Sequence, residues 1–223
     1  MIRCLDIHTH HQAPQPFGVI SCPIENFSPV DGQYYSIGVH PWETTTMPDR
    51  EFWKKFEQVA SLPCVVAIGE CGIDKLRGAP LFLQMLILKQ QIEISERLGK
   101  PMVLHAVKSQ EQIIGMRQDG EQKQNWAIHG FRAKPSIAKM YTDAGIYLSF
   151  GETFNDASLN AVPRNMILAE TDESPLSIEE VITNISSHLD GENSEQGLKN
   201  TFELIKSNTL DFFGSSKSIP EGF

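Results

Sequence analysis

The sequence predicts an α/β fold, most simply a closed (β/α)8 barrel. Three observations support this fold class: eight short strand-like runs, helical patterns between most of them, and apolar character that is nearly continuous in several runs. Continuous apolar runs are typical of parallel strands that are covered on both faces. A three-layer sandwich built from the same units is the alternative.

The candidate strands are short runs of apolar and β-branched residues. They lie near residues 2–7, 18–22, 33–38, 64–69, 101–105, 125–129, 146–150 and 166–170. The run CVVAIG at 64–69 illustrates the pattern, because it has no polar residue that would face solvent. Eight such runs are the number that a closed barrel requires.

Helical patterns separate most of these runs. They cover residues 49–60, 79–98, 108–118, 135–144, 177–188 and 195–212. Pro48 suits the start of the first helix, and Gly99 is a stop signal for the second, whose apolar residues share one broad face. The segments 11–17, 23–32 and 151–164 are too short and Pro-rich to hold a helix. We therefore expect a barrel in which some outer helices are shortened or missing.

Length and charge limit the class of protein. The chain has 223 residues, 40% of them apolar, which favours one domain over residues 1–214 followed by a frayed tail at 215–223. The formal charge of −9 excludes the extended basic surface of a non-specific duplex binder. A nucleic-acid substrate remains compatible with this charge, because bound divalent cations reverse the field inside a pocket.

The cysteines and the chain start bear on the compartment. Cys4, Cys22, Cys64 and Cys71 form no C-x-x-C pair and lie mostly in apolar runs, so we expect reduced, buried thiols. The N-terminus lacks the apolar stretch of a secretory leader, and no segment approaches the roughly 20 apolar residues that span a bilayer. These features predict a cytoplasmic protein without a membrane partner.

Histidines and carboxylates gather where the predicted strands end. In the first run, Asp6, His8 and His10 alternate along the chain and therefore face the same side. Two imidazoles spaced in this way can reach one cation, and Asp6 would lie one layer deeper and orient them.

The same placement recurs along the chain. Glu70, His105, His129 and Asp172 each lie at or just beyond the end of a later run. Because active sites of barrels are built at this end, the set could hold two divalent ions with one carboxylate bridging them. Glu70 is assigned to bridging, since a carboxylate has two oxygens, and Asp74 is expected to orient the loop or a histidine.

Other histidines and aromatic residues have less defined roles. His11 and His188 end no strand and are expected on an exposed loop and helix face. His40 is either a polar strand end held by a rigid turn or a group that contacts substrate. For Trp42, Phe131 and Phe154, packing in the core is favoured over stacking on nucleobases.

Several motifs together resemble the TatD family of metal-dependent hydrolases, within the amidohydrolase superfamily. The matching segments are DIHTHH, GVHPW, GECGID, LQMLILKQQIEISERLGKPMVLH, HGFRAKPSIAKMYTDAGIYLSFG and ILAETDESPL. The combination of GECGID with ETD is far more specific than the opening D-x-H-x-H. The resemblance covers nearly the whole chain in order.

The resemblance implies a distorted TIM barrel with two metal positions. One position would be held by His8, His10, Glu70 and Asp172, and the other by Glu70, His105 and His129. The family includes magnesium-dependent deoxyribonucleases with 3′-to-5′ exonuclease action.

Departures from the family pattern concern the substrate. Val107 stands where the family often has an arginine, and the segment before GVHPW is shorter by about one βα unit. Lys75, Lys108 and Arg132 are therefore the candidates for phosphate contacts, together with His40 as a substrate contact.

These observations predict hydrolysis of a phosphodiester in DNA or in a small phosphoester by a metal-bound hydroxide. Asp172 would be a ligand and the general base, and Glu70 would bridge two divalent ions whose identity, Mg, Mn or Zn, stays open. The alternative is a hydrolase of a small ester, lactone or amide, and a remote alternative is a non-catalytic metal-binding scaffold. No obligate protein partner is expected.

Overall fold

Eight parallel strands close into a barrel, and each strand pairs with its neighbours in the sequence. The structure is a computed structural model that describes residues 4–11, 18–43, 45–120, 122–189 and 194–214. The strands are β1 (Asp6–Thr9), β2 (Gly18–Cys22), β3 (Tyr34–Ile37), β4 (Val65–Asp74), β5 (Met102–Val107), β6 (Trp126–Ile128), β7 (Tyr147–Phe150) and β8 (Ile167–Ala169). The predicted barrel is confirmed, and the three-layer sandwich is wrong. The expected frayed tail at 215–223 lies outside the described residues.

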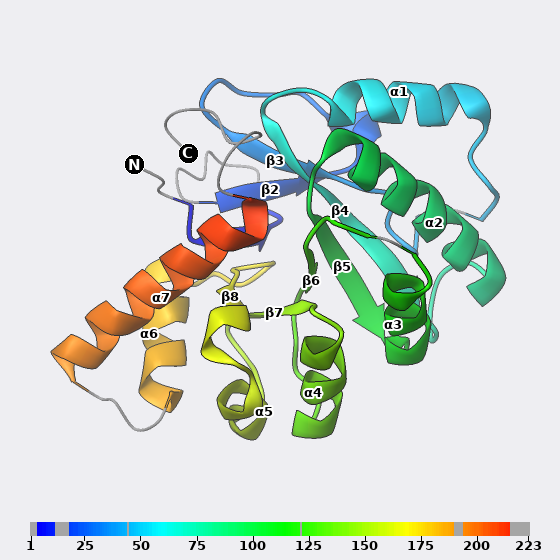
Figure 1. The fold of residues 1–223 in the computed structure, drawn as a ribbon. Coiled ribbons are helices and arrows are strands. Elements are labelled where there is room, and N and C mark those ends of the chain that lie inside the picture. The colour runs from blue at the N-terminus through cyan, green and yellow to red at the C-terminus, as the bar shows by residue number, and fades with distance from the viewer. Residues whose placement is uncertain (1–3, 12–17, 44, 121, 190–193, 215–223) are drawn as a thin grey trace.

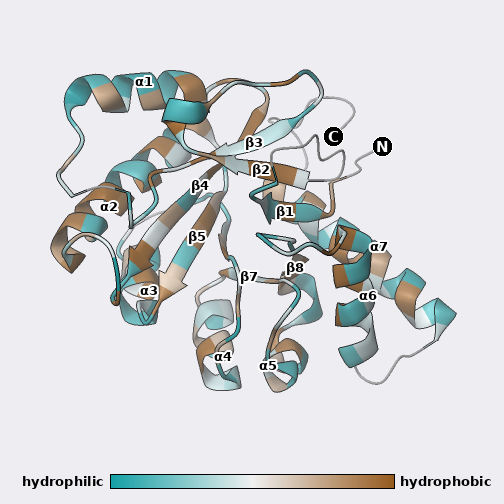
Figure 2. Ribbon diagram, turned by 180° about the vertical axis from the view of Figure 1, so that it is seen from behind, coloured by the Kyte–Doolittle hydropathy of each residue, from teal (hydrophilic) through white to brown (hydrophobic). Residues whose placement is uncertain are grey.

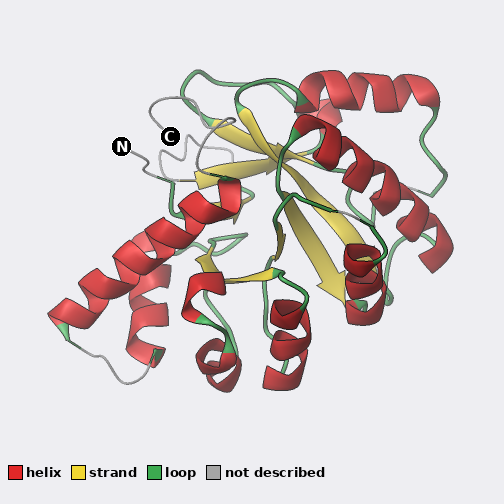
Figure 3. Cartoon of the chain, viewed as in Figure 1, coloured by secondary structure: helices red, strands yellow, loops and turns green. Residues whose placement is uncertain are grey.

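Helices cover the barrel from β3 onward (Figures 1 and 3). They are α1 (Arg50–Ala60), α2 (Leu81–Leu98), α3 (Gln110–Gln118), α4 (Pro135–Asp143), α5 (Asp156–Ala161), α6 (Ile178–His188) and α7 (Glu195–Phe213). Between β2 and β3 there is only a 3-10 turn, Ile24–Asn26, as the short connection predicted. None of the helices in the described part of the chain is long and apolar enough to cross a membrane.

The segment 151–164 does contain a helix, contrary to the sequence expectation. Asn155 caps α5, because its Oδ1 accepts a hydrogen bond of 3.0 Å from the Ser158 amide. Leu159 on this helix is fully buried. Capping and burial together stabilise this short helix, which the sequence pattern alone did not indicate.

Strand β4 is longer than predicted and places Glu70 inside the strand. Its pairing with β5 continues to Asp74, opposite Val107. Gly72 has a φ of +142°, and a Cβ at this position would collide with the His105 carbonyl. The glycine therefore permits the close approach of β5 that carries the pairing past Glu70.

The buried residues form two layers, because successive strand residues face opposite sides of the barrel. Figure 2 shows the hydrophobic character of β4 and β5. Met102 and Leu104 on β5 pack in the layer that contains the helices, whereas Val103 packs in a second layer with Phe212 and Phe213 from the end of α7. Asn125, just before β6, donates to the backbone carbonyls of Asp211 and Phe212 at 2.9 and 3.0 Å. The end of α7 thus closes the N-terminal side of the barrel and leaves the opposite side for chemistry.

The four cysteines are free thiols, as predicted. Cys4, Cys22 and Cys71 are buried and Cys64 is partly buried. Burial raises the pKa of the Cys4 and Cys71 thiols, which keeps them protonated.

Candidate metal centre

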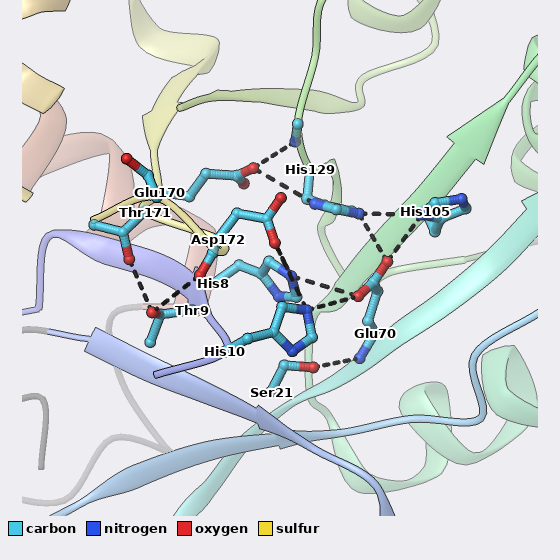
Figure 4. A network of polar contacts seen from close by, with 12 residues as sticks. His8, Thr9, His10, Ser21, Glu70, His105, His129, Glu170, Thr171 and Asp172 are labelled. Atoms are coloured by element: carbon cyan, nitrogen blue, oxygen red, sulfur yellow. Dashed lines mark hydrogen bonds and ion pairs between the residues drawn. The ribbon is translucent and has the colours of Figure 1, made fainter. Parts of the chain in front are cut away.

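The six residues expected to bind metal lie together at the C-terminal end of the barrel (Figure 4). They come from five strands or the residues just beyond them: His8 and His10 from β1, Glu70 from β4, His105 from β5, His129 after β6 and Asp172 after β8. Closure of the barrel is what brings these ends together, since β1 pairs with β8. Glu70 lies at the middle of the group.

The two oxygens of Glu70 face different histidines. Oε2 lies 3.5 Å from Nε2 of His8 and 3.2 Å from Nε2 of His10. Oε1 lies 2.9 Å from Nδ1 of His105 and 2.8 Å from Nε2 of His129. This arrangement has the geometry that a carboxylate needs to join two neighbouring cation positions.

Asp172 completes the group that contains His8 and His10. Its Oδ1 lies 3.7 Å from Nε2 of His8 and 3.6 Å from Nε2 of His10. The backbone fixes this position, because the Asp172 amide donates to the His8 carbonyl and the His10 amide donates to the Asp172 carbonyl, both at 3.0 Å. Asp172 has a φ of +53°, a conformation that is uncommon outside glycine and recurs at functional sites.

The residues present fit divalent cations. His8 is fully buried, yet neither of its ring nitrogens has a hydrogen-bond partner among the described residues. A buried polar atom without a partner is costly, and a cation would remove that cost at Nε2, which faces Glu70 and Asp172. Imidazole nitrogens combined with carboxylate oxygens suit zinc, manganese and related ions, and carboxylates also suit magnesium.

The charge of Glu70 is stabilised by its neighbours. Burial opposes ionisation of this carboxylate, but the adjacent His129 and the hydrogen bonds to His10, His105 and His129 hold its pKa well below the usual range. The pKa of His129 moves in the opposite direction. Burial would lower it, but Glu70 and Glu170 outweigh that effect and raise it. Glu70 is therefore an anion ready to bind cations.

Asp6 orients the backbone of two ligand-bearing strands rather than an imidazole ring. Its Oδ1 accepts from the His8 amide at 3.2 Å and from the Thr171 amide at 3.0 Å, and its Oδ2 accepts from the Thr171 hydroxyl at 2.6 Å. Burial raises the pKa of Asp6 to about 7, against the effect of these hydrogen bonds. Asp6 therefore orients the metal-binding residues through their backbone, whereas the sequence indicated direct orientation of the histidine rings.

Glu170 is a functional candidate that sequence reasoning missed. It is fully buried, its Oε1 accepts from the Gly130 amide at 2.5 Å, and the same oxygen lies 3.5 Å from Nδ1 of His129. A carboxylate that faces the second nitrogen of an imidazole ligand fixes the orientation and tautomer of the ring. The signal in the sequence was an acidic residue at the end of the apolar run MILAE.

His40 lies beside Glu70, with Nε2 3.0 Å from Oε1. Asp74 fulfils both of the roles that were considered for it. Its Oδ1 accepts from the amides of Leu76 and Arg77 at 2.8 and 3.2 Å, which orders the loop, and its Oδ2 lies 3.4 Å from Nε2 of His105.

The three aromatic residues differ in their surroundings. Phe131 is buried and Phe154 packs against the core, in agreement with the expectation. For Trp42 that expectation is wrong, because the residue is 40% exposed and lines the cavity of the metal centre. Its Nε1 donates to Oδ2 of Asp74 at 2.8 Å, which holds the ring at the rim instead of in the core.

The basic residues that were predicted to contact phosphate do not all lie together. Lys108 and Arg132 line a second cavity, which shares His129 with the metal centre. Lys75 is exposed beyond the end of β4 and lines neither of these cavities.

Of the two remaining histidines, His188 is exposed at the end of α6, as expected. His11 is partly buried instead of exposed, because its Nε2 lies 2.7 Å from the Ser174 carbonyl across the barrel closure.

Solved structures with the same fold are known. The chain superposes on the E. coli K12 TatD homolog YjjV with a TM-score of 0.78 and 19% identity, covering 95% of this chain and 98% of that one. It superposes on a TatD family hydrolase of Entamoeba histolytica with a TM-score of 0.70 and 16% identity, covering 82% of this chain and 75% of that one. At these identities the similarity shows the fold.

Sequence comparison also finds curated relatives. An uncharacterized metal-dependent hydrolase of Buchnera aphidicola subsp. Acyrthosiphon pisum is 26% identical over 160 residues, 65% of this chain and 60% of the relative. A 3′-5′ ssDNA/RNA exonuclease TatD of Cronobacter turicensis is 28% identical over 151 residues, 63% of this chain and 57% of the relative. The matches thus extend over less than two thirds of these relatives' length.

The sequence model of a family described as TatD related DNase matches residues 27–201. This range includes Glu70, His105, His129 and Asp172, and it begins after His8 and His10. The fold, the arrangement of the six residues and this match agree, and the chain belongs to the TatD related DNase family.

Proposed function

We propose that this protein is a divalent-metal-dependent phosphodiesterase that degrades single-stranded DNA from its 3′ end. The observation that carries the proposal is the position of Glu70, with one oxygen facing His8 and His10 and the other facing His105 and His129. A centre of this kind suits in-line displacement at a phosphodiester, which requires charge neutralisation on both sides of the phosphorus.

The residues divide into two ligand groups. His8, His10, Glu70 and Asp172 would hold one cation, and Glu70, His105 and His129 the other. Two cations bound there would neutralise the non-bridging phosphate oxygens and increase the acidity of the attacking water.

Asp172 is the proposed proton acceptor. Its side chain is 28% exposed, the most accessible of the carboxylates that face the histidines of this centre, and it lines the cavity of about 270 Å3 where substrate would enter. An accessible carboxylate at the wall of the reaction cavity can take a proton from water as the phosphodiester is attacked. Buried Glu70 instead has both oxygens directed toward imidazoles.

His40 and Trp42 also line this cavity. The His40 ring packs edge-on against Trp42, with centroids 4.7 Å apart. We propose that His40 contacts the phosphoryl group, because it is the histidine beside Glu70 that is left over after the two ligand groups are assigned.

The relatives named as exonucleases support the choice of a nucleic-acid substrate. Hydrolysis of a small ester, lactone or amide is the second candidate, favoured by the modest volume of the cavity. Both reactions use the same residues, so substrate panels must separate them.

The test is release of mononucleotides from a 3′-end-labelled single-stranded DNA by metal-stripped protein resupplied with Mg2+, Mn2+ or Zn2+. We expect metal-dependent release by the wild type and a loss of about 100-fold or more in kcat for Asp172→Asn. Asp156→Asn, an exposed carboxylate on α5, is the matched control and should keep full activity.

Cleavage of carboxyl esters without any cleavage of phosphodiesters would support the second candidate. Binding of two ions without hydrolysis of any substrate would indicate a non-catalytic scaffold. Near-normal turnover by Asp172→Asn with metals bound would exclude the proton-acceptor role.

A further inference from the structure

A second cavity, of about 450 Å3, adjoins the metal centre between the β5–α3 and β6–α4 connections. Its walls are largely apolar. They include Val107, Ile128, Phe131, Ile137 and Tyr141. This volume lies within the range of cavities that hold small organic ligands.

Three cationic side chains surround this cavity: Lys108, Arg132 and Lys134. All three are exposed, and none of them has an ion pair with a carboxylate in the described part of the chain. No acidic residue lines the cavity. In a chain with a net charge of −9, such a group of unpaired cations marks a place that favours an anion.

The adjacent helix adds to the positive potential. Lys134 is the N-cap of α4, so the positive end of the helix dipole lies at the cavity rim. Lys108 has a φ of +52°, and Asp172 is the other non-glycine residue with positive φ among the residues described. The cavity thus combines apolar walls, which suit a base or sugar, with a cationic rim, which suits a phosphate.

His129 connects this cavity to the metal centre, because it lines both. The two cavities are therefore neighbours, and one extended ligand could reach both. A nucleotide has this combination of parts: a phosphate for the cations, and a base and sugar for the apolar walls.

We infer that the cavity lined by Lys108, Arg132, Lys134 and the apolar residues binds the nucleotide that adjoins the scissile phosphodiester. The inference rests on the proposed function and deepens it, because it assigns a place on the protein to the nucleotide next to the scissile phosphodiester. The phosphate of that nucleotide contacts the cationic rim while its base packs on the apolar walls.

Binding can be measured without catalysis. Calorimetric titration of metal-stripped protein with deoxyadenosine monophosphate should show saturable binding that weakens with salt. The Arg132→Gln/Lys134→Gln double variant should raise the Kd about tenfold, because charge-assisted contacts to phosphate are lost. Lys139→Gln is the matched control: it lies on the same helix α4, is paired with Asp143 and does not line the cavity.

Kinetics provide an independent measurement. The double variant should lose about tenfold more kcat/KM on a single-stranded oligonucleotide than on bis(p-nitrophenyl) phosphate, mainly through KM, because the small diester has no neighbouring nucleotide. Equal losses on both substrates would overturn the inference.

The outcomes separate the two proposals. If neither phosphodiester is cleaved with any metal, the proposed function fails, and the titration still decides the cavity. If the wild type does not bind the mononucleotide, or binds it with the same Kd as the double variant, the inference about the cavity is wrong.

Discussion

Two of the imidazoles on the Oε1 side of Glu70, those of His105 and His129, each face a second carboxylate. His105 lies between Glu70, 2.9 Å from Nδ1, and Asp74, 3.4 Å from Nε2. His129 lies between Glu70, 2.8 Å from Nε2, and Glu170, 3.5 Å from Nδ1. These outer carboxylates restrict the rotation of the rings before any cation binds, which reduces the ordering cost of metal binding.

At the residue scale, the variant Glu170→Gln tests whether the carboxylate of Glu170 helps His129 to bind metal. The substitution keeps the shape and an acceptor for the Gly130 amide but removes the negative charge beside His129. We expect metal affinity to fall about 10- to 100-fold at one of the two positions, with little change in fold. Calorimetric titration with Mn2+ or Zn2+ measures the effect.

Glu179→Gln on the exposed first turn of α6 is the control, with unchanged metal affinity expected. If Glu170→Gln binds both ions like the wild type, Glu170 serves only the Gly130 amide.

At the scale of elements, α2 positions two loops through buried glutamines. Gln91 accepts from the Val39 amide at 2.7 Å and donates to the Val39 carbonyl at 3.2 Å, next to His40. Gln84 accepts from the Asp74 amide at 2.8 Å and donates to the Asp74 carbonyl at 2.9 Å. The helix thus provides hydrogen bonds to the backbone where β3 and β4 end, and it fixes the backbone next to His40 and at Asp74.

The variant Gln91→Leu tests this arrangement. It keeps the volume roughly constant but leaves the buried amide and carbonyl of Val39 without these partners. Each orphaned group costs about 1–3 kcal/mol, so the loss of both partners should lower the free energy of unfolding by about 2–6 kcal/mol. Urea denaturation of the metal-stripped protein gives this value.

The control is Gln90, one position earlier on α2, which contacts Glu93 at the surface. Gln90→Leu should change the free energy of unfolding by less than about 0.5 kcal/mol. Equal stability of the two variants would show that the Val39 backbone finds other partners.

At the scale of the whole molecule, the metal centre connects strands from the beginning, the middle and the end of the sequence. Its residues lie on or beyond β1, β4, β5, β6 and β8, so a cation that binds the folded barrel must stabilise it against unfolding. At a metal concentration of 100 times the Kd, the gain is about 2.7 kcal/mol. For a chain of this size we expect Tm to rise by about 5–10 °C.

Thermal denaturation of metal-stripped protein with and without added Mn2+ measures this shift. Glu70→Ala should lose it, because both groups of histidines lose their shared carboxylate. Glu203→Ala, at an exposed position of α7, should retain it. A full shift in Glu70→Ala would contradict the central position of this residue.

The amino-acid sequence was sufficient to predict the alternation of strands and helices. It also predicted that His8, His10, His105, His129 and Asp172 lie near strand ends. These features depend on local periodicity, and in a parallel barrel strand ends converge whatever the loops do. The sequence did not determine that Glu70 lies inside β4, because the extension follows from close backbone approach at Gly72. Tertiary structure alone decided the pairing of Glu170 with His129, the exposure of Trp42, and the cavity that gathers Lys108, Arg132 and Lys134. The physical reason is that these contacts join residues far apart in sequence, and only the register of the strands and the closure of β8 on β1 set their distances.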